Sequence, residues 1–177
     1  MLKLCLKFGT VAGLLVGVPL FLLTVLLPSH EEGMLVGYLT MLIALSAVFL
    51  AIKRHRDVAL GGVIRFWPAL AIGLGISVVA GLFYVAAWEL AVSVAHLDFA
   101  DAYAKAQIAQ KAAAGVSEAE LQGFTAEMEQ WRRDYANPLY RLPMTFCEIF
   151  PVGVLVSLIS AGLLRSSRFL PARGRVT

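Results

Sequence analysis

The chain has 177 residues, of which 59% are hydrophobic and only 15% are charged, and its mean hydropathy is +0.78. This composition excludes an ordinary soluble domain. It predicts one all-α integral membrane domain over residues 1–177, with four transmembrane helices and an extracytoplasmic helical hairpin between the third and the fourth.

Charge is divided unevenly among the polar stretches. Ten basic residues and one acid, a net charge of +9, lie in three of them: Lys3 with Lys7, 53–65, and 165–175. Five basic residues and nine acids, a net charge of −4, lie in the other two: 28–33 and 98–141. Because basic loops tend to stay in the cytoplasm, both termini are expected there, and the two acidic stretches are expected outside.

The first apolar run, residues 8–27, predicts a spanning helix. A cleaved secretory signal is the alternative, but twenty apolar residues exceed its usual hydrophobic core and no A-x-A-like site follows. Gly9, Gly13 and Gly17 recur every fourth residue in this run. This double GxxxG pattern favours close packing against another helix.

The second run, residues 34–52, ends at a basic cluster that contains Lys53, Arg54 and Arg56. A nucleic-acid patch is one interpretation of such a cluster, but a basic stop after a spanning helix is the commoner one. We therefore expect these three side chains to contact anionic lipid and expect no nucleic acid partner. His55, a lone histidine among bases, is expected to be solvated.

The third run, residues 67–90, is the most strongly apolar stretch and predicts the central helix. Gly73, Ser77 and Gly81 recur every fourth residue, which again favours a neighbouring helix at close range. A spanning helix needs about 20 residues, so the hydrocarbon layer should end before Glu89. Glu89 is thus expected at the outer interface.

Residues 98–137 predict a helical insertion outside the membrane. Its first half, 98–114, is either a separate helix or a prolongation of the third span. Gly115 predicts a helix end, and the pair Ser117 and Glu120 is typical of a capping box that starts a second helix.

An apolar seam runs along the second half of this insertion. Leu121, Phe124, Met128, Trp131 and Tyr135 recur at spacings of three and four, while Glu118, Glu127, Glu129 and Arg132 are expected to face elsewhere. Packing against the first half is the preferred interpretation. Lying on the outer leaflet and binding a partner helix remain alternatives.

The fourth run, residues 143–164, ends before Arg165 and carries Gly153 and Ser157 four residues apart. The candidate helix-packing residues of the chain are therefore Gly9, Gly13, Gly17, Gly73, Ser77, Gly81, Gly153 and Ser157.

Glu148 lies inside this fourth run, where an ionised carboxylate is expensive. Pro151 removes the helical partner of the Cys147 carbonyl, so an acid and a free carbonyl are expected side by side. These residues and Glu89 form a candidate proton or ion site. The expected partners of Glu148 are Glu89, Arg141, Tyr84, or a water on the Cys147 carbonyl; the alternative is that Glu148 snorkels to the outer surface.

No catalytic, metal-binding or cofactor-binding motif is present: HExxH, GxSxG and phosphate-binding loops are absent, and His and Cys are not clustered. We therefore expect no enzyme and no cofactor. The preferred function is a structural, assembly or accessory membrane subunit that packs against a second copy or another membrane protein. The alternative is a small proton- or cation-coupled carrier or channel that uses Glu148 and Glu89.

Several stretches resemble the bacterial membrane proteins of the domain of unknown function 4199 family. They are Gly37-Tyr38 with Met41-Leu42-Ile43 and Ser46, Lys53 to Asp57 with Gly61-Gly62, Asn137-Pro138, Glu148 to Gly153, and Ser157 to Ser160. The resemblance covers most of the chain in the right order. It implies a four-helix protein of the bacterial inner membrane and supplies no activity.

Overall fold

The computed structural model describes residues 1–26, 33–94 and 98–172, and this part of the chain is helical apart from short connections. The helices are α1 (Leu2–Leu26), α2 (Gly33–Ala59), α3 (Phe66–Val94), α4 (Phe99–Ala113), α5 (Glu118–Tyr135) and α6 (Pro138–Leu164). Four of them, α1, α2, α3 and α6, are long and apolar enough to cross a membrane. An all-helical chain with four helices of spanning length is thus confirmed.

The helices extend beyond the apolar runs that predicted them. α1 begins at Leu2, and α2 continues through the basic cluster to Ala59. Hydropathy marks only the length that fits the hydrocarbon layer, whereas the hydrogen-bonded helix continues until a residue stops it. α6 begins before residue 143 because the Asn137 side chain accepts from the Leu139 N–H at 3.0 Å and Pro138 occupies the first turn.

The alternative that residues 98–114 prolong the third span is wrong. α3 ends at Val94, and Asp98 caps a separate helix, α4, by accepting from the Asp101 N–H at 3.1 Å. A carboxylate at the helix N-terminus satisfies an N–H group that has no partner within the helix. The predicted turn between the first two spans lies outside the described residues, except for Gly33.

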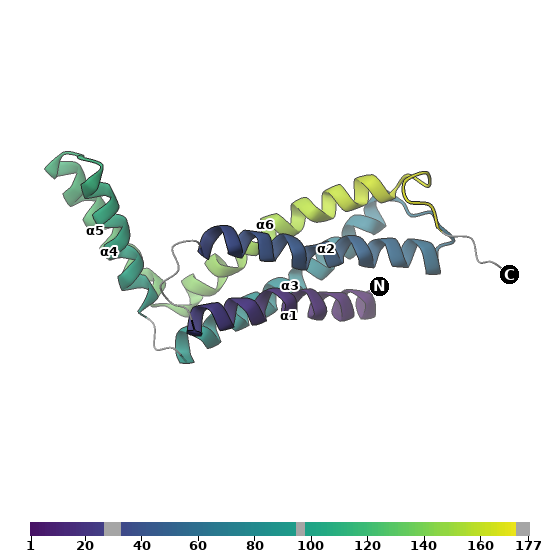
Figure 1. The fold of residues 1–177 in the computed structure, drawn as a ribbon, viewed down its shortest axis with the longest axis horizontal. Helices are drawn as coiled ribbons and strands as arrows, with labels where there is room; N and C mark the ends of the chain where they lie inside the picture. Colours follow the sequence, from purple (N-terminus) through teal and green to yellow (C-terminus); the bar gives the residue numbers. More distant parts are fainter. Residues whose placement is uncertain (27–32, 95–97, 173–177) are drawn as a thin grey trace.

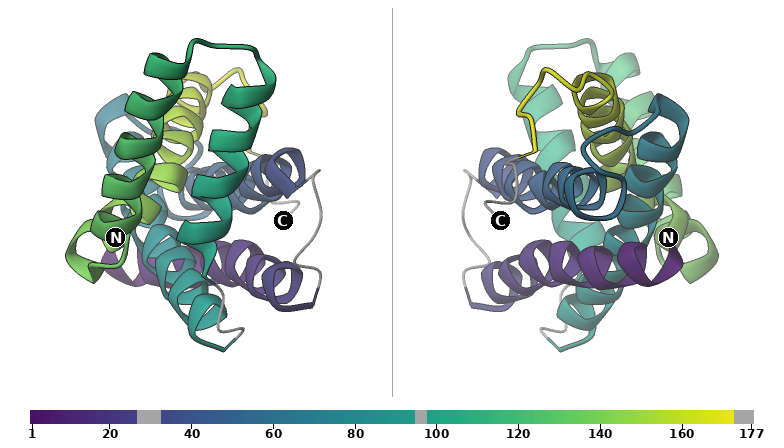
Figure 2. Two further views of the ribbon diagram at one scale, coloured as in Figure 1. Left: turned by 90° about the vertical axis from the view of Figure 1, so that its left-hand side faces the viewer. Right: turned by 90° about the vertical axis from the view of Figure 1, so that its right-hand side faces the viewer.

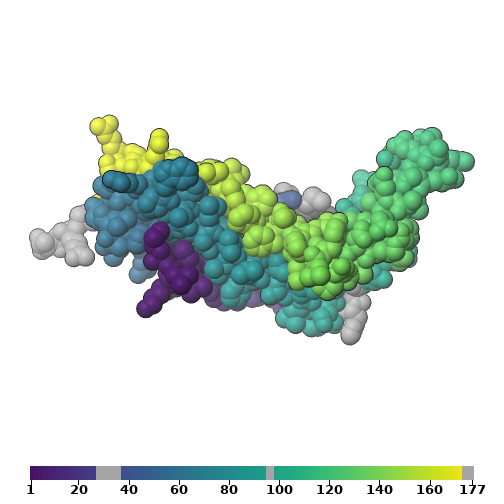
Figure 3. Space-filling model, turned by 180° about the vertical axis from the view of Figure 1, so that it is seen from behind, coloured from purple at the N-terminus to yellow at the C-terminus, as the bar shows by residue number. Residues whose placement is uncertain are grey.

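α4 and α5 lie side by side and project from one end of the four long helices, as Figures 1, 2 and 3 show. Their connection uses the residues that the sequence indicated. Gly115 adopts φ +73°, a left-handed conformation that favours glycine, and the Ser117 hydroxyl accepts from the Glu120 N–H at 3.3 Å. We call α4 and α5 together the arm.

α1 and α3 are parallel and pack through the glycines of α1. A Cβ atom added at Gly9 would lie 2.5 Å from Val79 Cβ, and one added at Gly13 would lie 2.5 Å from Phe83 Cβ. Gly17 faces Ala87 in the same way, at 3.1 Å. Each contact joins residues 70 positions apart, so the two helices keep one register along this face. Only glycine permits this approach.

α3 and α6 are antiparallel and meet through a second set of small residues. A Cβ atom added at Gly73 would lie 2.6 Å from Ser157 Oγ, and one added at Gly153 would lie 2.6 Å from Ser77 Cβ. The two serine Oγ atoms are 3.5 Å apart, and each hydroxyl also donates to a carbonyl of its own helix. Gly81 faces Phe146 across the same interface.

α2 completes the bundle with a buried apolar stripe that contacts the other three long helices. Leu45, Val48 and Ile52 on this stripe are fully buried. Both ends of the described chain lie at the end of the bundle opposite the arm (Figure 1). We call the end of the bundle where both chain ends lie the basic end. The opposite end of the bundle, which carries the arm, is the arm end. Arg173 and Arg175 of the basic stretch lie outside the described residues.

Candidate functional sites at the two ends of the bundle

Glu89 and Arg141 form a two-pronged ion pair at the arm end. Arg141 Nε lies 2.6 Å from Glu89 Oε1, and Arg141 Nη2 lies 2.6 Å from Glu89 Oε2. The Arg141 side chain is 16% exposed and the Glu89 side chain is 29% exposed, so solvent screens the pair only partly. It ties the end of α3 to the start of α6, and it occupies both carboxylate oxygens of Glu89.

Tyr135, the last residue of α5, connects this ion pair to the arm. Its carbonyl accepts from Arg141 Nη1 at 3.3 Å, and its hydroxyl accepts from Trp88 Nε1 at 2.9 Å. The Phe99 ring of α4 lies 5.7 Å from the Tyr135 ring and 4.9 Å from the Trp88 ring. α3, α4, α5 and α6 therefore meet at one point. We call Trp88, Glu89, Phe99, Tyr135 and Arg141 the Tyr135 cluster.

The cluster shields Tyr135 from water, and this residue is 7% exposed. Burial raises the pKa of the Tyr135 hydroxyl, and the hydrogen bond from Trp88 acts in the opposite direction. The hydroxyl is therefore neutral at ordinary pH. It serves here as a hydrogen-bonding group within the junction between the arm and the bundle.

The arm is held together by aromatic contacts and ion pairs. The Trp131 ring of α5 lies 5.1 Å from the Tyr103 ring of α4, and Lys111 Nζ lies 4.8 Å from the centre of the Phe124 ring. Leu121, Phe124, Met128 and Trp131 are half-buried, Tyr135 is buried and Glu127 is exposed. The predicted seam therefore faces α4.

Arg132 does not face away from α4 as expected. Its Nη1 lies 3.2 Å from Asp101 Oδ1 on α4, and its Nη2 lies 3.1 Å from Glu129 Oε2. Asp101 also pairs with Lys105 at 2.7 Å, and these cations hold the pKa of the Asp101 carboxyl below its usual range. The prediction was wrong because a long arginine side chain can bend back across the edge of a helix pair.

Glu148 lies on the exposed side of α6 and has a different partner from Glu89. The Tyr84 hydroxyl of α3 donates to Glu148 Oε2 at 3.1 Å. Tyr84 was among the predicted partners, whereas Arg141, another of them, is paired with Glu89. Cys147 and Pro151 are also exposed on this side of α6. The two acids that the sequence grouped into one candidate site thus have separate hydrogen-bond partners.

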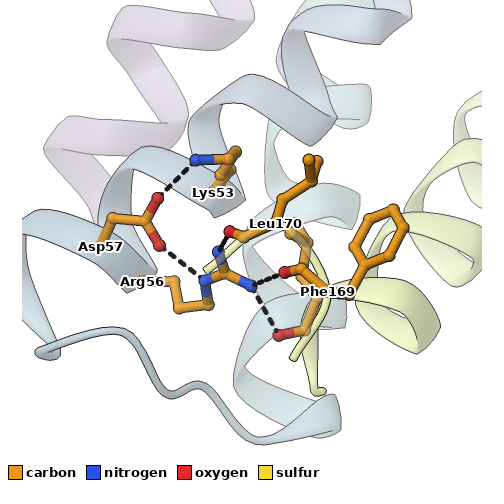
Figure 4. Close-up of polar contacts among 6 residues, drawn as sticks. Lys53, Arg56, Asp57, Phe169 and Leu170 are labelled. Carbon is orange, nitrogen blue, oxygen red and sulfur yellow. Dashed lines mark hydrogen bonds and ion pairs between the residues drawn. The ribbon is translucent and has the colours of Figure 1, made fainter. Parts of the chain in front are cut away.

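At the basic end Arg56 is fully buried. Figure 4 shows its polar contacts in close-up. Its Nη1 lies 3.4 Å from the Leu164 carbonyl oxygen, at the end of α6, and 3.0 Å from the Phe169 carbonyl oxygen. Its Nη2 donates to the carbonyl of Leu170. Its Nε lies 2.7 Å from Asp57 Oδ1. The guanidinium group therefore fastens the segment after α6 to the end of α2.

The burial of Arg56 contradicts its predicted contact with anionic lipid. Arg56 has no exposed surface with which to meet a headgroup, while Lys53 is 30% exposed and Arg54 is exposed. Lys53 Nζ also lies 2.6 Å from Asp57 Oδ2. A signal was present in the sequence: Asp57 is the one acid among the ten basic residues of its three stretches.

Within the described residues, no three His, Cys, Asp or Glu side chains gather closely enough to hold a metal ion. Cys5 is buried against α3, and Cys147 is exposed near the arm end; both are free thiols.

The sequence model of one protein family, described as "Protein of unknown function (DUF4199)", matches residues 7–166. The match leaves out only six residues at the start of the chain and eleven at its end, and it confirms the resemblance noted from the sequence. No curated protein and no solved structure matches the chain.

Proposed function

The chain belongs to the DUF4199 family, and we propose that it is an accessory or assembly subunit of a bacterial inner membrane that holds the arm in a fixed position for a partner. The observation that carries this proposal is the Tyr135 cluster, in which side chains of four helices fasten the base of the arm. A simple connection between two spans would need no such junction, because short loops join neighbouring helices equally well.

The helix faces that carry small residues are already covered within the bundle, so a partner would have to bind elsewhere. Gly9, Gly13 and Gly17 are covered by α3, and Gly73 and Gly153 are covered by serines of the facing helix. These faces hold the bundle itself together and are not free for another chain. The arm then offers the partner surface, since Gln122 and Glu127 on α5 are exposed.

The charge distribution supports an orientation for this proposal. We place the arm outside the cytoplasm and both termini inside it. In this orientation the basic stretches, with a net charge of +9, lie on the cytoplasmic side, and the acidic stretches lie on the other side. Lys53 and Arg54 would contact anionic lipid at the inner surface.

Site-specific photo-crosslinking in intact cells tests the proposal. A photoreactive residue at Gln122 or Glu127 should give an adduct of one defined mass, while the matched control at exposed Arg168, at the basic end, should not. Adducts of equal yield at all three positions, or at Arg168 alone, would contradict a partner bound through the arm.

A second candidate function rests on the hydrogen bond between Tyr84 and Glu148. In α6, Glu148 lies 16 residues, about 24 Å, from Leu164 at the basic end, which is about 6 Å inside a 30 Å hydrocarbon layer. A carboxyl group at that depth is a candidate for binding a proton or cation, and the Tyr84 hydroxyl would assist it.

Substitution of Glu148 distinguishes a carboxyl group that merely reaches the surface from a proton or ion site. If the carboxyl merely reaches the surface, Glu148→Gln is neutral and Glu148→Leu raises the melting temperature with full function retained in cells. If it is a proton or ion site, both variants fold but lose any dependence of function on pH or ions. A Glu148→Leu protein that melts higher and keeps that dependence would eliminate the second candidate.

A further inference from the structure

An open pocket of about 310 Å³ lies where the arm meets the bundle. Four helices line it: Val92 comes from α3, Phe99 from α4, Arg133 and Tyr135 from α5, and Arg141 from α6. The volume is at the lower end of the range for small-molecule sites, so it accommodates a compact group rather than a whole substrate of drug size.

Its depth matches the headgroup layer of a bilayer. Arg141 lies 23 residues from Leu164 along α6, about 35 Å, whereas the hydrocarbon layer is about 30 Å thick. Val92 lies 25 residues from Trp67 along α3, about 38 Å by the same measure. The pocket therefore begins about 5 Å beyond the hydrocarbon, where lipid phosphates and interfacial aromatic rings are found.

Three arginines line the pocket, and one of them, Arg133, is available to a ligand. Arg141 is paired with Glu89, and Arg132 with Asp101 and Glu129. Arg132 Nε has no hydrogen-bond partner within the described part of the chain, but it is buried and offers no surface to a ligand oxygen. Arg133, which is exposed, donates to a neutral acceptor, Gln130 Oε1, at 2.8 Å.

The pocket also contains a carboxylate, which limits the charge of a suitable ligand. Asp98 lines it, and its Oδ1 accepts from the Asp101 N–H at the start of α4. A carboxylate in the same pocket as Arg133 disfavours a doubly charged free phosphate more than a singly charged phosphodiester. The apolar side chains Val92 and Phe99 complete the wall and suit a ligand with a hydrocarbon part.

We infer that this pocket binds the phosphodiester of a phospholipid headgroup. Arg133 donates to the phosphate oxygens, and Val92 and Phe99 contact the glycerol and the upper acyl chain. This site differs from the predicted lipid contact of Lys53 and Arg54, which lies at the opposite end of the bundle. It does not depend on the proposed function of the arm.

Native mass spectrometry of the purified full chain in a mild detergent tests the inference, with short-chain phosphatidylglycerol as the probe. The wild type should retain the lipid, and Arg133→Gln should weaken binding about tenfold, since one charged hydrogen-bond donor is lost. Arg133→Lys should restore part of the binding. The matched control is Arg168→Gln, an exposed arginine at the basic end, which should bind as the wild type does.

Three further measurements separate the alternatives. A short-chain diacylglycerol, which lacks the phosphate, should not bind, and inorganic phosphate should not displace the lipid. Val92→Phe, which fills the pocket without changing its charge, should weaken binding while the melting temperature stays unchanged. Equal binding by the wild type and Arg133→Gln, or retention of diacylglycerol, would overturn the inference. Displacement by inorganic phosphate would show a site for the free anion instead.

Discussion

One arginine lies at the centre of the contacts at each end of the bundle. Both arginines bind a carbonyl group at the end of a helix, but their other partners differ. Both donate to the carbonyl of the last residue of a helix: Arg141 to Tyr135 in α5, and Arg56 to Leu164 in α6. Such carbonyls have no partner within their own helix. Arg141 otherwise binds the Glu89 carboxylate, whereas Arg56 binds two further backbone carbonyls and Asp57.

The difference shows what fixes each end. The arm end depends on side chains of opposite charge that meet across helices and remain partly exposed. The basic end depends on a buried cation that holds the backbone of the chain after α6. Loss of a partner at the basic end should therefore destabilise the fold more, because an unpaired polar group costs far more free energy in a buried site than where water can reach it.

The largest expected effect is the all-or-none accessibility of the two ends. An impermeant maleimide applied to intact cells should label a cysteine at Ala112, in the arm, and should spare one at Ser167, at the basic end. Both positions are exposed, so accessibility to the reagent depends on the side of the membrane. The reverse pattern would invert the proposed orientation.

The next effect compares the arginines directly. Arg56→Ala should lower the free energy of unfolding by about 3–5 kcal/mol, because it removes a fully buried cation and leaves three carbonyls and Asp57 Oδ1 without this donor. Arg141→Ala should cost about 1.5–3 kcal/mol, the range for hydrogen bonds to charged groups, since water reaches Glu89. Thermal or denaturant unfolding in detergent measures both.

The control for that comparison is Arg54→Ala, which changes an exposed neighbour in the same helix and should alter stability by less than about 0.5 kcal/mol. A larger loss for Arg141→Ala than for Arg56→Ala would reverse the comparison of the two ends.

A smaller effect is expected for the seam of the arm. Trp131→Ala should cost about 2–3 kcal/mol, somewhat less than a fully buried tryptophan, because Trp131 is half-buried between Tyr103 and Tyr135. Glu127→Ala, on the exposed side of the same helix, should change little. An unchanged melting temperature for Trp131→Ala, with a clear loss for Glu127→Ala, would show that the seam faces the other way.

The smallest effect concerns pH. Lys105 and Arg132 lower the pKa of Asp101 in the folded arm, so the carboxylate stabilises the arm at neutral pH. This contribution is present above the unfolded pKa, about 3.9, and is lost as the pH falls through the lower folded value. Asp101→Asn should remove that part of the pH dependence in melting curves recorded between about pH 5 and pH 2. Persistence of the full dependence would assign it to other groups.

Sequence patterns predicted the contacts that depend on residue size and repeat. The four-residue spacing of Gly9, Gly13 and Gly17 identified a helix face, although it could not name α3 as the neighbour. Similarly, the three-four spacing of the arm seam identified the side that meets α4. Spacing along one helix fixes which residues share a face, but the partner of that face depends on the whole topology.

Contacts with backbone were not predictable in the same way. Arg56 was interpreted as a lipid contact because its neighbours are basic, yet three of its four acceptors are carbonyl groups more than 100 residues away. Any residue supplies a carbonyl, so no residue type in the sequence signals such a site. The ion pair of Glu89 with Arg141 was not predicted either: Arg141 was a candidate partner of Glu148, and Glu89 was expected only at the outer interface.

The parallel register of α1 and α3 also constrains the order in which the protein can assemble. During synthesis α1 and α2 are complete before α3 exists, so the glycine face of α1 stays uncovered until 70 further residues have been made. Helices usually associate only after each has been inserted, and contacts between distant segments form late. A chain interrupted after α2 would therefore present Gly9, Gly13 and Gly17 to other membrane helices, and the completed α3 is what removes that surface from competition.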